Sequence, residues 1–79
     1  MRHLKVQNIK DALHPSEAVV EVRTQDGSQF VVVSRNALSN DRLSVSFPLM
    51  EEQDHYLVQL PAETQSGAWR VWVPKSEVA

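Results

Sequence analysis

The chain has 79 residues, no cysteine and a formal net charge of −2, and 42% of its residues are hydrophobic. This length limits it to one domain, residues 1–79, and the lack of cysteine excludes disulfides, thiol nucleophiles and cysteine-based zinc sites. The acidic total argues against a protein that covers a nucleic-acid backbone with positive charge.

The hydrophobic pattern indicates a cytoplasmic protein. The longest apolar run, Phe30–Val33, is far shorter than a membrane span. No apolar run of signal-peptide length follows the charged residues at the start. We therefore expect a cytoplasmic protein that makes no membrane contact.

The first third of the chain predicts two strands joined by a short helical segment. Alternating apolar residues indicate a strand over residues 3–8. Residues 9–14 predict a short turn of helix, which Pro15 ends because the residue before a proline avoids the helical region. Residues 17–25 alternate again and predict a second strand.

The Asp-Gly pair at 26–27 predicts a tight hairpin after this strand. Asp-Gly between apolar runs favours a type I′ turn, which needs positive φ at both central residues. The return strand then covers residues 28–34. A single helical turn follows over 34–40, capped by Ser34 or Asn36.

The second half of the chain predicts three further strands. Residues 43–49 alternate between apolar and polar side chains, which is typical of a half-buried strand. Residues 50–55 predict a polar loop, residues 56–60 a strand with Tyr, Val and Leu facing inward, and residues 61–67 a turn. The last strand is expected over 69–73.

Together these segments predict an all-β fold. Turn signals recur about every 8–12 residues, which favours a sandwich or barrel. We therefore expect a small barrel or sandwich of five to six mostly antiparallel strands, with one or two single helical turns.

The chain also repeats itself at an offset of 40 residues. Residues 24–38 and 64–78 share Thr, Gln, Gly and two Val at corresponding positions. Further positions correspond in character: Arg35 with Lys75, and Leu38 with Val78. Two such β-hairpin units would pack as a pseudo-twofold structure, with the last apolar residue of each closing one end of the core. The alternative is a coincidence between two ordinary hairpins of similar composition.

The end of the second unit carries two family resemblances. Residues 71–78, Val-Trp-Val-Pro-Lys-Ser-Glu-Val, resemble the end of an SH3-like barrel, where a strand runs into a proline-led single turn and an apolar residue. The same residues are similar to the Pro-Lys strand end of swapped-hairpin transition regulators and antitoxins. The SH3-like resemblance implies a strand that ends in a single turn, whereas the transition regulators and antitoxins continue from this strand end into a helix. Neither resemblance singles out one family.

Two tryptophans on the last predicted strand define a candidate protein interface. They are three residues apart and so lie on opposite faces. We expect Trp69 to point inward and Trp72 to stay exposed beside Arg70, while Phe30 and Val32 share this outer face in the first unit. Aromatic and aliphatic side chains next to arginine are typical of interface centres. The alternative is that a loop of the same chain covers them.

A second candidate site would bind anions. Arg35 and Lys75 occupy corresponding positions in the repeat, where they would hold a phosphate across the pseudo-twofold axis. Arg70 and Trp72 nearby would stack a base. This arrangement predicts nucleic-acid binding whose affinity falls steeply with salt.

The sequence offers no pattern for catalysis, a metal or a cofactor. The three histidines are far apart in sequence, unlike the close spacing of common metal ligands. The acidic run at 51–54 lacks the glycine of a calcium loop. No serine lies in a nucleophile-elbow motif, and the chain has only two glycines, too few for a phosphate-binding loop. We therefore expect a protein that is not an enzyme and holds no metal or cofactor.

These observations favour a non-catalytic protein-interaction module or subunit. We expect it to contact a protein partner, or a second copy of itself as a homodimer, through the strand faces at 30–33 and 70–72. Nucleic-acid binding by a small β-barrel is the first alternative. A small inhibitor encoded by a phage or mobile element, which masks a larger protein, is the second.

Overall fold

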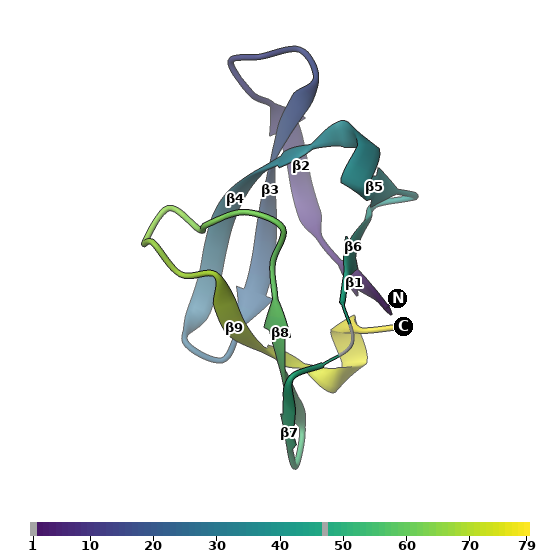
Figure 1. Ribbon diagram of the computed structural model, residues 1–79, viewed down its shortest axis with the longest axis vertical. Helices are drawn as coiled ribbons and strands as arrows, with labels where there is room; N and C mark the ends of the chain where they lie inside the picture. The colour runs from purple at the N-terminus through teal and green to yellow at the C-terminus, as the bar shows by residue number, and fades with distance from the viewer. Residues whose placement is uncertain (1, 47) are drawn as a thin grey trace.

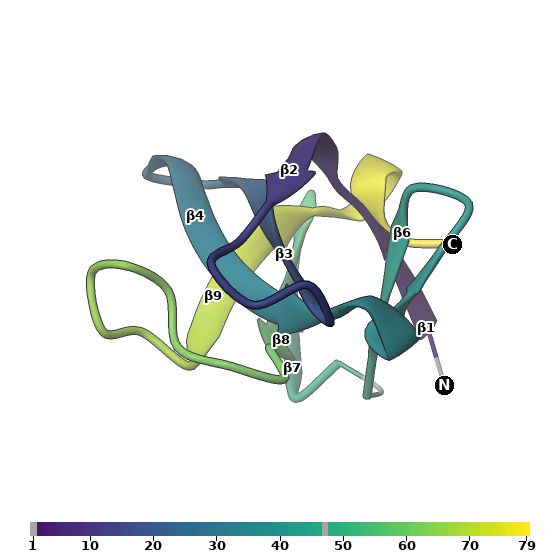
Figure 2. The same cartoon turned by 90° about the horizontal axis from the view of Figure 1, so that it is seen from above.

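The computed structural model describes residues 2–46 and 48–79 and confirms an all-β fold. Three small antiparallel sheets surround a common centre (Figures 1 and 2). The described strands are more numerous than the five or six expected. The elements are β1 (Arg2–Lys5), β2 (Gln7–Asp11), β3 (Glu17–Thr24), β4 (Gly27–Ser34), the 3-10 turn η1 (Arg35–Ala37), β5 (Leu38–Ser39), β6 (Arg42–Val45), β7 (Met50–Glu52), β8 (His55–Gln59), β9 (Arg70–Pro74) and the 3-10 turn η2 (Lys75–Glu77).

The long hairpin β3–β4 follows the predicted alternation. The inward positions of both strands are buried, and the positions between them face outward. A strand projects alternate side chains to opposite faces, so one face can enter the core while the other stays polar or exposed. The buried positions are Ala18, Val20, Val22, Val31 and Val33.

The turn of this hairpin differs from the prediction. Thr24 pairs with Gly27 across the ladder, and Gly27 has a φ of +104° while Asp26 keeps a negative φ. A type I′ turn over the Asp-Gly pair is therefore not formed. Positive φ at two successive residues occurs instead at Asn40 and Asp41, 52° and 62°, which join β5 to β6. Asn and Asp tolerate this region better than other side chains.

The predicted helical turn after β4 is confirmed. It is the 3-10 turn η1, and the Ser34 hydroxyl accepts a hydrogen bond from the backbone N–H of Asn36 at 3.2 Å. Leu38, the residue after η1, packs against the core, as does Val78 after η2. Both residues close the core as the repeat predicts.

The helical turn predicted over 9–14 is wrong. Residues up to Asp11 belong to β2, in which Lys10 pairs with Val19 of β3. Pairing along a long neighbouring strand orders these residues more favourably than one isolated helical turn, whose nucleation is costly. Asn8, with a φ of 51°, marks an irregularity where the register of β2 shifts.

Two boundaries in the second half are also wrong. The strand predicted over 43–49 ends at Val45, and Leu49 is 47% exposed; Phe47 lies outside the described residues. The loop predicted over 50–55 contains β7, which pairs with β8 from Met50 opposite Leu57 to Glu52 opposite His55. β7 is missed because its three residues are all exposed and carry no alternation.

The order of elements in the first half of the chain recurs in the second half. We call residues 2–39 unit 1 and residues 42–79 unit 2. β2, β3 and β4 form one three-stranded meander, and β7, β8 and β9 form another. Each meander is preceded by a short strand, β1 or β6, and followed by a 3-10 turn, η1 or η2.

The remaining sheet joins the two units symmetrically. β1 pairs with β6, and Leu4 lies opposite Leu43 at the centre of this seam. On one side Leu38 pairs with Leu43, and on the other Val78 bridges to Leu4. Each unit thus adds its last residues to the first strand of the other unit, which is the pairing that a twofold axis through the seam requires.

The core repeats this symmetry. Within residues 2–46 and 48–79, the twelve residues of the buried cluster divide into six corresponding pairs, one member from each unit. In each pair the two residues occupy corresponding places in the two units, on or directly beside matching strands. The pairs are Leu4 and Leu43, Val6 and Val45, Val20 and Val58, Val22 and Leu60, Val31 and Val71, and Val33 and Val73.

The Thr-Gln-x-Gly turn of each unit contacts the other unit. The Gln65 N–H donates to the carbonyl of Phe30 on β4 at 2.9 Å, and the Gln25 N–H donates to the carbonyl of Trp72 on β9 at 2.8 Å. With an offset of 40 residues, Phe30 corresponds to Arg70, but the acceptor of the Gln25 hydrogen bond is Trp72. The acceptor in unit 2 is therefore two residues away from the position that exact symmetry requires. The repeat is therefore a structural duplication that departs locally from perfect symmetry.

Candidate interaction surface

The outer face of the β3–β4 hairpin carries an apolar patch. Val32 lies directly opposite Val19 in the ladder, and Phe30 lies next along β4, opposite Glu21. Phe30 is 38% exposed and Val32 is 45% exposed. We call Val19, Phe30 and Val32 the β4 patch.

The outer face of the second meander carries a matching row. Met50, Leu57 and Trp72 are successive partners across β7, β8 and β9, so their side chains lie side by side on one face. Met50 is 57% exposed, whereas Leu57 and Trp72 are half-buried. Arg70 is exposed on the same face of β9. We call Met50, Leu57, Arg70 and Trp72 the β9 patch.

The two tryptophans differ from the prediction. Trp69 was expected to point inward, but it is 48% exposed, and Trp72 is half-buried rather than fully open. β9 begins only at Arg70, so Trp69 precedes the strand and does not share its alternation. Trp72 does lie on the outer face as expected, because Val71 and Val73 on either side of it are buried.

A shallow pocket of about 200 Å³ lies beside the β9 patch, between the two units. Asp26 and Gln29 of unit 1 face Ser66, Arg70 and Trp72 of unit 2 across it. The Ser66 hydroxyl donates to the Gln29 side-chain oxygen at 2.8 Å, which links the walls at one point. Its size is below the usual range of about 300–1,000 Å³ for small-molecule sites.

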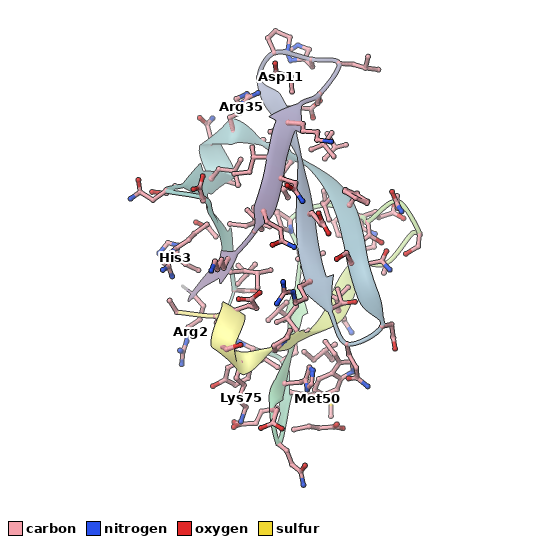
Figure 3. The ribbon with its side chains drawn as sticks, turned by 180° about the vertical axis from the view of Figure 1, so that it is seen from behind. Arg2, His3, Asp11, Arg35, Met50 and Lys75 are labelled. Atoms are coloured by element: carbon pink, nitrogen blue, oxygen red, sulfur yellow. The ribbon has the colours of Figure 1, made fainter. Side chains whose placement is uncertain are left out.

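The two residues of the candidate anion site are engaged elsewhere. Arg35 contacts the Asp11 carboxylate at 2.5 Å, and Lys75 contacts the Glu51 carboxylate at 2.6 Å. Figure 3 places Arg35 and Lys75 at opposite ends of the molecule. They are related by the repeat but do not face each other, so the structure does not bring them together around one phosphate.

These ion pairs are themselves corresponding features of the two units. Asp11 lies opposite Ala18, and Glu51 lies opposite Tyr56, at matching places in the two meanders. Each pair ties the second strand of its unit to the 3-10 turn that ends it. We call them the bracing ion pairs, because each one connects two elements of the same unit.

Lys75 has further contacts. Its ammonium lies 5.1 Å from the centroid of the Tyr56 ring, a cation–π distance. Its hydrogen bond to Glu51 raises the pKa of Lys75 above the ordinary lysine value of 10.5. This side chain thus contacts two neighbours of its own unit.

The described residues contain neither a cluster of metal ligands nor a membrane-spanning helix. Among residues 2–46 and 48–79, no group of three or more His, Asp or Glu side chains is placed to hold a metal ion. In the same residues, no helix is long and apolar enough to cross a bilayer.

Comparison with known proteins adds no further site. No protein-family model, curated protein or solved structure matches the chain. The candidate surface therefore depends on the geometry described above.

The sequence predicted four of the seven residues of the two patches. Phe30, Val32, Arg70 and Trp72 were found from strand alternation. Met50, Leu57 and Val19 were missed because their neighbours in space lie on other strands. The ladder registers, and above all the existence of β7, were needed to place Met50 and Leu57 beside Trp72.

Proposed function

We propose that the protein is a small non-catalytic interaction module that binds a protein partner through the β4 and β9 patches. The observation that carries the proposal is the set of apolar side chains on outer faces of the sheets, where Val32 and Phe30 remain 45% and 38% exposed. Apolar side chains clustered on a sheet surface are the usual centre of a protein interface.

The charges support a protein partner rather than a nucleic acid. Arg35 and Lys75 are paired with carboxylates, which lowers the positive field that a phosphate backbone would meet. Arg70 remains beside Trp72 on the β9 patch. An arginine next to a tryptophan is a common energetic centre of protein interfaces.

The proposal is tested by affinity capture from lysate of the source organism, with and without nuclease. The bait is the wild-type protein or one of two variants, Val32→Glu and Trp72→Glu, with Gln53→Glu as a control in an exposed turn. We expect a stoichiometric protein partner that survives nuclease, is retained by Gln53→Glu, and is lost by at least one patch variant.

Circular dichroism and thermal melting establish that each bait is folded. Val32→Glu is the decisive variant, because Val32 is more exposed than Trp72 and tolerates a charge with less effect on the core. Equal capture by wild type, Val32→Glu and Trp72→Glu would reject these patches as the interface. Recovery that disappears with nuclease would replace the proposal with nucleic-acid binding.

A further inference from the structure

The two units are joined covalently at one place, the turn at Asn40 and Asp41. Ser39 and Arg42 pair on either side of this turn. All other contacts between the units are non-covalent. They include the β1–β6 seam, the Leu4–Val78 bridge, the Val31–Thr64 bridge and the hydrogen bonds of Gln25 and Gln65. A unit from another copy of the chain offers the same groups for these contacts.

The linking turn is the strained part of this arrangement. Asn40 and Asp41 both have positive φ, 52° and 62°, and neither is glycine. A side chain in this region approaches the following carbonyl, which disfavours it even for Asn and Asp. Opening the turn into an extended strand relieves this strain at both residues. Short, strained connections of this kind favour exchange of elements between copies.

We propose that the chain also forms a dimer in which two copies exchange their units. In this dimer, unit 1 of each copy packs against unit 2 of the other, and the chain crosses from one lobe to the other in extended form at residues 40 and 41. Each lobe keeps the core and the seam of the monomer. The inference does not depend on the proposed function, because exchange uses the buried seam whereas partner binding uses the exposed patches.

The chain allows a direct test because it contains no cysteine. Lys5 and Arg42 face each other across the β1–β6 seam, and both are exposed. The neighbouring bond from the Val6 N–H to the Asp41 carbonyl makes the 5–42 pair a non-hydrogen-bonded one, whose Cα separation of about 4.5 Å suits a disulfide. In Lys5→Cys/Arg42→Cys, the disulfide forms within one chain in the monomer and between two chains in the exchanged dimer.

Variants of the linking turn at residues 40 and 41, called hinge variants, are made in this double-cysteine protein. They are expected to change the ratio of exchanged dimer to monomer in opposite directions. Asn40→Gly/Asp41→Gly relaxes the turn and keeps the monomer. Asn40→Val/Asp41→Val prevents it, because β-branched residues do not adopt positive φ. After refolding at high protein concentration and oxidation, we expect the ratio of covalent dimer to monomer to be at least about tenfold higher for the valine pair than for the glycine pair, with the parent between them.

The readout is a non-reducing gel together with native mass spectrometry. Asn40→Val alone provides a milder variant if the valine pair does not fold. Folded hinge variants that contain only intrachain disulfides overturn the proposal. A native dimer whose disulfides are all intrachain also overturns it, and assigns self-association to the surface patches instead. An interchain disulfide that persists when Trp72→Glu is added supports exchange independently of those patches.

Discussion

Unit 1 and unit 2 have matching interiors and different outer faces. Val20 and Val58, for example, are both fully buried at corresponding positions. On the outer faces, Val32 of unit 1 corresponds to Trp72 of unit 2, and Phe30 corresponds to Arg70. Packing around a shared core restricts the interior of both units, whereas the outer faces are free to differ. The outer-face positions at which the units differ are therefore the ones that the proposed interface uses.

The largest expected effect tests the equivalence of the interiors. Leu4→Ala and Leu43→Ala remove fully buried side chains that face each other across the seam. Each is expected to lower the free energy of unfolding by about 3 kcal/mol, and the two losses should agree closely. Urea denaturation followed by circular dichroism measures both. A difference of more than about 1.5 kcal/mol would show that the two sides of the seam are not equivalent.

The two turn glycines provide a smaller and sharper comparison. Gly27 and Gly67 have φ values of +104° and +87°, and a Cβ added to either meets no atom closer than 3.7 Å. The cost of Gly27→Ala or Gly67→Ala is therefore backbone strain alone, about 1–2 kcal/mol for each. Thermal melting of both variants checks this. A neutral effect at one glycine would mean that its turn relaxes to a different geometry.

The smallest expected effect is a difference in pH dependence between the two bracing ion pairs, Lys75–Glu51 and Arg35–Asp11. Because the pKa of Lys75 is raised by Glu51, the stabilisation is present at neutral pH and is lost as pH rises above the ordinary value of 10.5. Lys75→Met should thus be slightly less stable than wild type at pH 7, with the difference vanishing at high pH and falling with salt. Arg35→Met should keep its difference, because a guanidinium stays charged.

Melting temperatures of both variants and wild type, measured at neutral and at strongly alkaline pH, check this pair of expectations. Identical pH profiles for Lys75→Met and Arg35→Met would contradict it. An unchanged melting temperature for Lys75→Met at low salt would show that the Glu51 contact contributes nothing to stability.

The parts of the fold that sequence predicts well are those with long alternation. β3 and β4 are eight residues each, so their inward and outward faces are evident from the pattern alone. β7 has three exposed residues and no alternation of its own, so only its pairing with β8 defines it as a strand. Trp69 is misplaced for a related reason, since one residue at a strand boundary decides which face it occupies.

The duplication was only partly visible in the sequence. From Thr24 and Thr64 onward the spacing is a constant 40 residues, and the repeat is evident there. Earlier, Leu4 and Leu43 are 39 apart, and Val20 and Val58 are 38 apart, because the connections differ in length. No single offset aligns the first halves of the units. The ladder registers recover the correspondence because they depend on partners rather than on sequence distance.

The reciprocal turn contacts have a consequence for solubility. β4 and β9 are the last strands of their sheets, and the segment 29–34 of β4 has no charge, glycine or proline. A bare edge of this composition is a template for intermolecular β-pairing. Glu63–Gln65 lie along this edge of β4, through the Val31–Thr64 bridge and the Gln65 hydrogen bond. Unit 2 thus covers part of the open edge of unit 1 in the folded chain, and we expect this cover to oppose β-pairing between copies.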